Sequence, residues 1–383
     1  MQCQKFNEDW TFEKADQADR LKAFYGNSDA VAVTLPHDAM IREKRDKDCP
    51  SGAQSSFYPG GVYTYEKKFM AQNEWKTQDV FLEFEGIYGI ARVWINGALA
   101  AVNRNGYMGF SVDLKPWISY ENENIIRIDV DNSKQPNSRW YSGSGIYRDV
   151  NLWTGKDVYI SHDKLRITTL SVNDDMAVLE VCAQLKNIIG HGLEAECLIE
   201  IKKDGQKTAS DTQRVVFRSE QMQTVRVQIP IEQPKKWSPA QPALYECHIT
   251  TKFDDKICDE AVSNFGIRVL ELDPVHGLQI NGETVKLRGT CIHHDNGVIG
   301  AETFKEAEWY RCKRLKEAGF NAIRSAHHPM SIAMLDACDH IGMLVMDELT
   351  DMWDKEKNTY DFSDIFEDEY NQWINHMVEK DYN

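Results

Sequence analysis

The segment NAIRSAHHPMSIAMLDACDHIGMLVMDE, residues 321–348, carries the clearest local structure signals of this 383-residue chain. Its start, Asn321–Ser325, predicts a short strand, and Ser331–Ile341 predicts a helix that ends at Gly342. Leu344–Glu348 is a second short apolar run and predicts another strand. A strand, a helix and a strand in this order predict two parallel strands joined by a right-handed crossover.

A similar unit precedes this segment. Val285–Ile292 predicts a strand, and Thr303–Phe320 predicts a helix. Thr303 and Glu306 have the spacing of a capping box at the helix start, and Gly319 is a suitable residue for its end. We therefore expect a strand–helix unit here as well.

A third helix is predicted over Phe362–Tyr382, so the unit occurs three times after about residue 273. Two architectures fit this repetition: a small open parallel sheet, or the first three units of a (β/α)₈ TIM barrel. A whole barrel needs about 250 residues, whereas about 110 follow residue 273. The residues at the strand ends favour the second architecture, as described below.

The chain before these units is typical of β structure in two parts. Over residues 10–153 short β-rich runs alternate with turns, and Asn96-Gly97 after Ala91–Ile95 predicts a hairpin, because both turn residues tolerate positive φ. This texture predicts a jelly-roll β-sandwich. Over residues 154–268 longer alternating runs predict an immunoglobulin-like β-sandwich. The expected strands are Gly61–Phe69, Val80–Phe84, Ile125–Val130 and Tyr147–Trp153, followed by Met176–Leu185, Leu193–Lys202, Thr224–Ile229 and Leu244–Lys252.

The domain boundaries follow from these changes in pattern. We expect a jelly-roll domain over residues 1–154, an immunoglobulin-like domain over 155–269 and the incomplete barrel over 270–383. The middle domain carries no cluster of polar residues, so we interpret it as a scaffold.

Composition excludes several classes of function. The chain is 42% hydrophobic and 27% charged, as in ordinary globular proteins, and its net charge of −16 disfavours nucleic acid as a partner. Its apolar runs are too short to span a membrane, and its first residues do not resemble a signal peptide. The nine cysteines lack the CxxC spacing of zinc or redox sites, so we expect reduced thiols and a cytoplasmic protein.

Polar side chains gather where the predicted parallel strands end. The three ends are CIHHD (291–295), RSAHHP (324–329) and DELTDMW (347–353). In a barrel the carboxyl ends of the strands lie on one face and carry the functional groups. Imidazole, guanidinium and carboxylate groups hydrogen-bond hydroxyls, and an indole ring such as that of Trp353 suits the C–H face of a sugar.

Other interpretations of these residues are weaker. A lone histidine is more often an interior residue than a ligand, but here four lie at two adjacent strand ends. Their spacing matches no compact metal-ligand motif, so we expect neither a metal nor a cofactor. The motifs of acyl, phosphoryl and hydride transfer are likewise missing from the sequence.

Asp347 and Glu348 do not fit the paired carboxylates of a glycosidase. Adjacent strand residues point to opposite faces, whereas a retaining pair must stand about 5 Å apart across one bond. We expect one of them to hold an arginine such as Arg324 and the other to support the site.

In its motifs the chain resembles the N-terminal part of glycoside hydrolase family 2, the family of β-galactosidases, β-glucuronidases and β-mannosidases. The resemblance extends over essentially all 383 residues and is closest to the β-galactosidases. It is carried by LPHD (35–38), GVY (61–63), VWING (93–97), NSRWYSGSGIYR (137–148), FGIR (265–268), NG (281–282), KLRG (286–289), HHD (293–295), NAIR (321–324), HHP (327–329), DE (347–348) and DMW (351–353).

The resemblance implies a jelly-roll sugar-binding domain, an immunoglobulin-like domain and a TIM barrel that hydrolyses terminal β-glycosides with retention. It implies that the substrate is a carbohydrate and that residues from two domains bind it. The implied roles are substrate binding for His293, His327, Trp353, Asn137, Arg139 and Trp140, with Tyr141 beside them, and support of the site for Arg324, Asp347 and Glu348.

One departure from the family pattern concerns the catalytic residues. The family's acid/base is a Glu that follows an Asn at the fourth barrel strand, and its nucleophile is a Glu at the seventh strand. Residues 1–383 include neither strand, so we expect this chain alone to be inactive and to associate through the open barrel, with itself or with a complementary fragment. The alternatives are a non-catalytic carbohydrate-binding module, or a β-glucuronidase or β-mannosidase of the same family.

Overall fold

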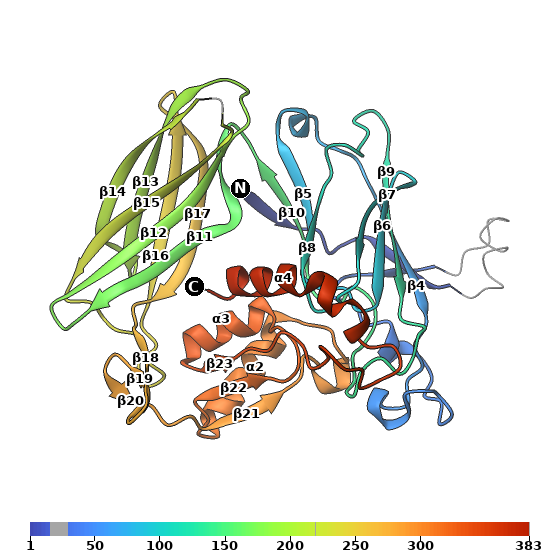
Figure 1. Cartoon of the computed structure of the whole chain (residues 1–383). Helices are drawn as coiled ribbons and strands as arrows, with labels where there is room; N and C mark the ends of the chain where they lie inside the picture. The colour runs from blue at the N-terminus through green and yellow to red at the C-terminus, as the bar shows by residue number, and fades with distance from the viewer. Residues whose placement is uncertain (16–29, 219, 383) are drawn as a thin grey trace.

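The computed structural model describes residues 1–15, 30–218 and 220–382 (Figure 1). Two β-sandwiches stand side by side, and a group of parallel strands and helices lies below them in the view of Figure 1. In the described part of the chain, no helix has the length and apolar character needed to cross a membrane. The predicted fold class is confirmed in all three parts.

The first sandwich consists of a four-stranded and a six-stranded antiparallel sheet, β1-β10-β5-β8 and β3-β2-β4-β9-β6-β7. The predicted hairpin is present: β6 pairs with β7, and Asn96 and Gly97 both have positive φ, at 50° and 84°. The strands are β1 (Gln2–Lys5), β2 (Trp10–Lys14), β3 (Val31–Val33), β4 (Val62–Phe69), β5 (Asp79–Phe84), β6 (Ile90–Ile95), β7 (Ala98–Asn103), β8 (Phe110–Asp113), β9 (Asn124–Asp131) and β10 (Val150–Gly155).

The second sandwich packs the sheet β11-β12-β15 on the sheet β14-β13-β16-β17. Alternate residues of its strands point into one apolar core, as in β12, where every second side chain is buried. The sequence did not predict β11, β14 and β17, because much of β14 and β17 exposes both faces and lacks a clear apolar alternation. The strands are β11 (Val158–Val172), β12 (Met176–Asn187), β13 (Leu193–Lys203), β14 (Gln206–Phe217), β15 (Met222–Glu232), β16 (Leu244–Phe253) and β17 (Lys256–Gly266).

The third part begins with a small antiparallel sheet and continues as three strand–helix units. The strands β21, β22 and β23 are parallel and adjacent in that order, which confirms the predicted crossovers. The elements are β18 (Leu270–Asp273), β19 (Gly277–Ile280), β20 (Glu283–Thr284), β21 (Gly289–Ile292), α2 (Lys305–Glu317), β22 (Ala322–Ser325), α3 (Ile332–Ile341), β23 (Leu344–Met346) and α4 (Ser363–Lys380).

Two local predictions in this part were wrong. The strand expected over Val285–Ile292 is limited to β21, because the chain before it turns back and the Val285 N–H donates to Leu278 O instead. The predicted capping box is not formed at α2: the Thr303 hydroxyl donates to Ala301 O, and the N-cap position is held by Phe304 without a side-chain bond. Thr303 is drawn to the first sandwich, where its N–H donates to Tyr147 O.

The start of α3 does carry a side-chain cap. The Ser331 hydroxyl accepts a hydrogen bond from the Met334 N–H at 3.2 Å, and Gly342 ends the helix with φ +83°. Replacement of Ser331 by alanine is expected to lower the free energy of unfolding by about 1 kcal/mol, because one helix N–H loses its partner. Urea unfolding followed by circular dichroism measures this loss. Ser210→Ala, on an exposed strand position, is the control and is expected to change stability by less than about 0.5 kcal/mol; an equal loss in both variants would contradict the assignment.

Helix α4 joins the three parts. It crosses between the two sandwiches in Figure 1, and side chains at both ends hold it there. Arg104 of the first sandwich pairs with Glu369, and Lys164 of the second pairs with Glu379. The third part is thus anchored to both sandwiches, which fixes its strand ends relative to the loops of the first.

Candidate active site

Two histidines stand side by side at the ends of adjacent parallel strands. His293 follows β21 and His327 follows β22, and the register of the strands brings the two rings to 5.6 Å between centroids. His327 has φ +81°, a backbone conformation that costs a non-glycine residue energy and that clusters at functional sites. The two strand ends therefore present a pair of imidazoles on the same face.

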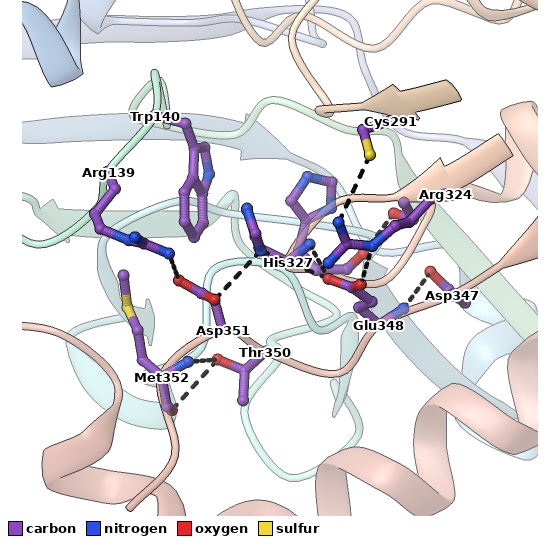
Figure 2. Close-up of polar contacts among 12 residues, drawn as sticks. Arg139, Trp140, Cys291, Arg324, His327, Asp347, Glu348, Thr350, Asp351 and Met352 are labelled. Carbon is purple, nitrogen blue, oxygen red and sulfur yellow. Dashed lines mark hydrogen bonds and ion pairs between the residues drawn. The ribbon is translucent and has the colours of Figure 1, made fainter. Parts of the chain in front are cut away.

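Trp140, from a loop of the first sandwich, stacks on both rings, and Figure 2 shows it beside His327. Its indole lies 5.5 Å from the His293 ring at an interplanar angle of 8°, and 4.7 Å from the His327 ring at 27°. Trp140 is only 9% exposed, and its Nε1–H donates to the Tyr107 hydroxyl at 2.9 Å. The site thus includes two domains, and the indole face is occupied by imidazoles.

Glu348 holds His327 from behind. One carboxylate oxygen pairs with the Arg324 guanidinium, and the other accepts the His327 backbone N–H at 2.7 Å. The neighbouring Asp347 points elsewhere and accepts the Met330 N–H at 3.0 Å. The two carboxylates thus bind different N–H groups of one loop, His327 and Met330, and together they fix both ends of the loop that carries His327.

Asp351 lies beside His327 and forms ion pairs with cationic side chains (Figure 2). It forms ion pairs with Arg139 and, at 2.9 Å, with Lys357, and its other neighbour is His327 Nδ1 at 3.4 Å. Burial opposes ionisation of Asp351, but Lys357 and Arg139 outweigh it and lower the pKa of this carboxyl. Burial lowers the pKa of His327, although Asp351 and Glu348 oppose the shift.

Three sequence models match the chain in succession. The model described as glycosyl hydrolase 2 galactose-binding domain-like matches residues 10–157, glycosyl hydrolases family 2 matches 158–268, and the TIM barrel domain of the same family matches 274–381. The chain belongs to glycoside hydrolase family 2. The matched ranges follow the two sandwiches and the βα units of the structure.

Relatives within family 2 are similar over almost the whole chain. A β-galactosidase of Bacteroides ovatus is 33% identical over 99% of this chain and 44% of its own length, and a β-glucuronidase of Bacteroides fragilis is 27% identical over 90% and 46%. A solved family 2 structure from Bacteroides cellulosilyticus superposes with a TM-score of 0.95 at 32% identity, covering all of this chain and 50% of that one. The chain thus spans about half the length of these relatives.

The two remaining histidines of this family 2 chain are interior residues. His328 is fully buried and stacks on Tyr107 with 4.6 Å between centroids, while His294 Nε2–H donates to Ser142 O at 2.8 Å. Burial lowers the pKa of His294 to about 3 and holds that of His328 well below its usual value. The strand-end pattern treated all four histidines alike, and only the family resemblance singled out His293 and His327.

Removal of the buried His328 imidazole tests this separation by pH. The pKa of His328 is lower in the folded chain than in the unfolded chain. Below about pH 6.5 the unfolded chain therefore binds a proton that the folded chain does not, and the free energy of unfolding falls. His328→Phe keeps the stack on Tyr107 but has no imidazole to protonate. Between pH 7 and pH 5 its free energy of unfolding should therefore fall by roughly 2 kcal/mol less than that of the wild type. Urea unfolding at both pH values measures the difference, and His276→Phe, at an exposed position, should leave it unchanged.

Two further predicted site residues lie apart from the histidine pair. The Asn137 side-chain amide donates to Asn132 Oδ1 and Lys134 O within its own loop. Trp353 follows the buried Met352 and is 57% exposed. Their roles in substrate binding stay predictions, whereas Arg139, Trp140, Arg324 and Glu348 lie around His327 (Figure 2).

Sequence reasoning missed two residues that join the first sandwich to the strand ends. Asp38 is fully buried and accepts four hydrogen bonds, from Met40 N, Ser144 N, Ala301 N and the Tyr141 hydroxyl. Arg148 is 2% exposed and donates to the backbone oxygens of Pro329 and Tyr107. LPHD is one of the motifs that carry the family resemblance, but three of the four partners of Asp38 lie more than 100 residues away in the sequence.

Larger cavities lie elsewhere in the described structure. Spaces of about 970 and 760 Å³ separate the sandwiches from the βα units, and neither is lined by His293 or His327. Among the residues with described positions, no group of three or more His, Cys, Asp or Glu side chains is arranged to hold a metal ion.

Proposed function

We propose that this chain forms the terminal-sugar pocket of a retaining exo-β-glycosidase of the β-galactosidase type. The observation that carries the proposal is the pair of imidazoles, His293 and His327, held on adjacent strand ends beneath Trp140. A neutral imidazole donates one hydrogen bond and accepts another, which suits sugar hydroxyls. Similarity to a β-galactosidase over 99% of the chain supports this choice of sugar.

The residues of the pocket divide into contacts and supports. His293 Nδ1 is buried and has no hydrogen-bond partner among the described residues, so its hydrogen-bonding capacity is unused there. Glu348 and Arg324 fix the backbone of His327, and Asp351 fixes its ring. A hydroxyl of the terminal sugar would be received between the two rings and orient the glycosidic bond.

We further propose that residues 1–383 bind a glycoside without cleaving it. Retention requires a general acid and a carboxylate nucleophile on the two sides of one bond. Glu348 is committed to Arg324 and the His327 N–H, while burial and the neighbouring Asp381 raise the pKa of Asp347 to about 8 and Asp347 faces Met330. Neither carboxylate is free for the chemistry, which would use residues of the remaining strands.

Titration of the purified chain with methyl β-D-galactopyranoside, D-glucuronate and methyl β-D-mannopyranoside, followed by NMR, tests the proposal. We expect the wild-type chain to bind the galactoside, and we expect His293→Ala and His327→Asn each to abolish this binding. Asparagine is chosen at position 327 because it tolerates positive φ. The exposed His276→Ala is the control. Preference for glucuronate would assign the chain to the β-glucuronidases, and binding that survives both site variants would favour a carbohydrate-binding module on the first sandwich. Turnover of p-nitrophenyl β-galactoside at ordinary rates would contradict inactivity.

Two accompanying proposals concern location and assembly. The nine cysteines are all free thiols, which suits a reducing, cytoplasmic compartment; cell fractionation tests this. The outer strands β21 and β23 of the three-stranded sheet have one unpaired edge each, and Leu287 and Met346 nearby are about half exposed. We propose that the chain associates through these edges, and a monomer in light scattering across concentrations would contradict it.

A further inference from the structure

Tyr107 lies at the centre of the contacts between the first sandwich and the histidines. It belongs to the loop between β7 and β8 and is 2% exposed. Its ring stacks on His328 and meets the edge of His294 at 5.1 Å, and its hydroxyl accepts the Trp140 Nε1–H at 2.9 Å. Tyr107 therefore touches the interior histidine pair directly and the pocket pair through Trp140.

We propose that Tyr107 is a positioning residue: its hydroxyl fixes the rotation of the Trp140 indole, and the indole fixes the planes of His293 and His327. The proposal rests on the proposed function of these two histidines. It assigns to the first sandwich a specific task in the pocket, which is to orient imidazoles supplied by the barrel strands.

The hydrogen bond to Trp140 determines one ring orientation. An indole has a single donor, and a buried donor without a partner is costly. Only the rotation that directs Nε1 to the Tyr107 hydroxyl satisfies it within the described contacts. In that rotation the indole is nearly parallel to the His293 ring, at 8°, so a turn of Trp140 would disturb the stacking on both histidines.

Tyr107 is itself held in place. Its ring lies 5.1 Å from the ring of Tyr88, whose hydroxyl donates to Asn137 Oδ1 at 3.4 Å. The loop that carries Tyr107 is fixed by Asn105, whose side-chain oxygen accepts the Tyr107 N–H at 3.0 Å. Packing on Tyr88 and the bond to Asn105 thus hold Tyr107, and Asn137 reaches this group only through its bond with Tyr88.

The experiment compares Tyr107→Phe with Tyr147→Phe. Both substitutions remove one buried hydroxyl from the same aromatic cluster, but the Tyr147 hydroxyl donates to Gly106 O at 3.0 Å and does not contact Trp140. A structural role alone predicts similar effects of the two. Trp140→Phe removes the donor of the same bond while keeping an aromatic ring.

Two quantities are measured on the chain with ¹⁵N-labelled histidine. Tyr107→Phe and Trp140→Phe should each shift the side-chain nitrogen signals of His293 and His327, and each should weaken binding of methyl β-D-galactopyranoside roughly tenfold, the size expected for one hydrogen bond. The double variant should be no weaker than either single one, because both remove the same contact. Tyr147→Phe should stay within about twofold of the wild type.

Unchanged histidine signals in Tyr107→Phe, or equal shifts in Tyr147→Phe, would overturn the proposal. If the wild-type chain binds no glycoside, the proposed function fails, but the histidine signals still test the positioning role by themselves. If Tyr107→Phe shifts the signals and leaves affinity unchanged, the hydroxyl orients the rings without serving the pocket, and the proposal is also overturned.

Discussion

Replacement of Asp38 by alanine is expected to lower the free energy of unfolding by about 4 kcal/mol, the largest effect on stability that we predict. The carboxylate is fully buried and accepts four hydrogen bonds between 2.6 and 3.0 Å. Its loss would leave three backbone N–H groups and the Tyr141 hydroxyl without a partner, each at a cost of about 1 kcal/mol or more. Ala301 belongs to the third part of the chain, so the variant should also loosen the contact between domains.

Urea unfolding monitored by tryptophan fluorescence measures this effect. The control is Asp46→Ala, which removes an exposed carboxylate that accepts one N–H, from Asp48, and should cost less than about 0.5 kcal/mol. The same carboxylate also restricts position 300, because a Cβ on Gly300 would lie 2.3 Å from Asp38 Oδ2. A stability loss of Asp38→Ala no larger than that of the control would show that the four donors find other partners.

Glu348→Gln is expected to weaken glycoside binding by roughly 10- to 100-fold, because misplacement of a binding group by about 1 Å has an effect of this size. The carboxylate receives hydrogen bonds from Arg324 and from the His327 N–H. An amide at this position must turn its NH₂ group toward one of these donors, which breaks one bond. His327 would then lose the contact that holds its backbone at φ +81°.

The matched control is Glu317→Gln. It removes the same charge from another pairing with an arginine, Arg314, on the exposed surface of α2, where such pairs contribute little. Affinity for methyl β-D-galactopyranoside by calorimetry and the fold by circular dichroism are measured for both variants. If Glu348→Gln keeps its affinity while folded, Glu348 does not support the pocket.

The fold was predictable wherever local signals and tertiary contacts agree. Ser331 and Gly342 delimit α3 by their own chemistry, and Asn96-Gly97 forms its turn for the same reason. Thr303 carries an equally good local signal, but its side chain and N–H bind Ala301 and Tyr147 instead. The contact of Thr303 with the distant Tyr147 takes the place of the expected helix cap, and a local sequence pattern cannot predict such a contact.

The site was predictable in part for a similar reason. Strand ends collect on one face of a parallel sheet, so His293 and His327 could be expected to meet. The sequence could not tell that their neighbours His294 and His328 turn inward, because this depends on Tyr107, which comes from another domain. Trp140 was predicted as a substrate contact, which stays a prediction; that its ring, 9% exposed, stacks on His293 could not be read from the sequence.

The indole that covers the histidines also has a consequence for biogenesis. On the ribosome, domains generally fold as units with the N-terminal one first, so the loops with Tyr107 and Trp140 leave the exit tunnel well before β21 and β22. The histidine side chains then pack against Tyr107 and Trp140, which are already in place. Misfolding of the first sandwich would therefore misplace His293 and His327 even where the βα units themselves fold normally.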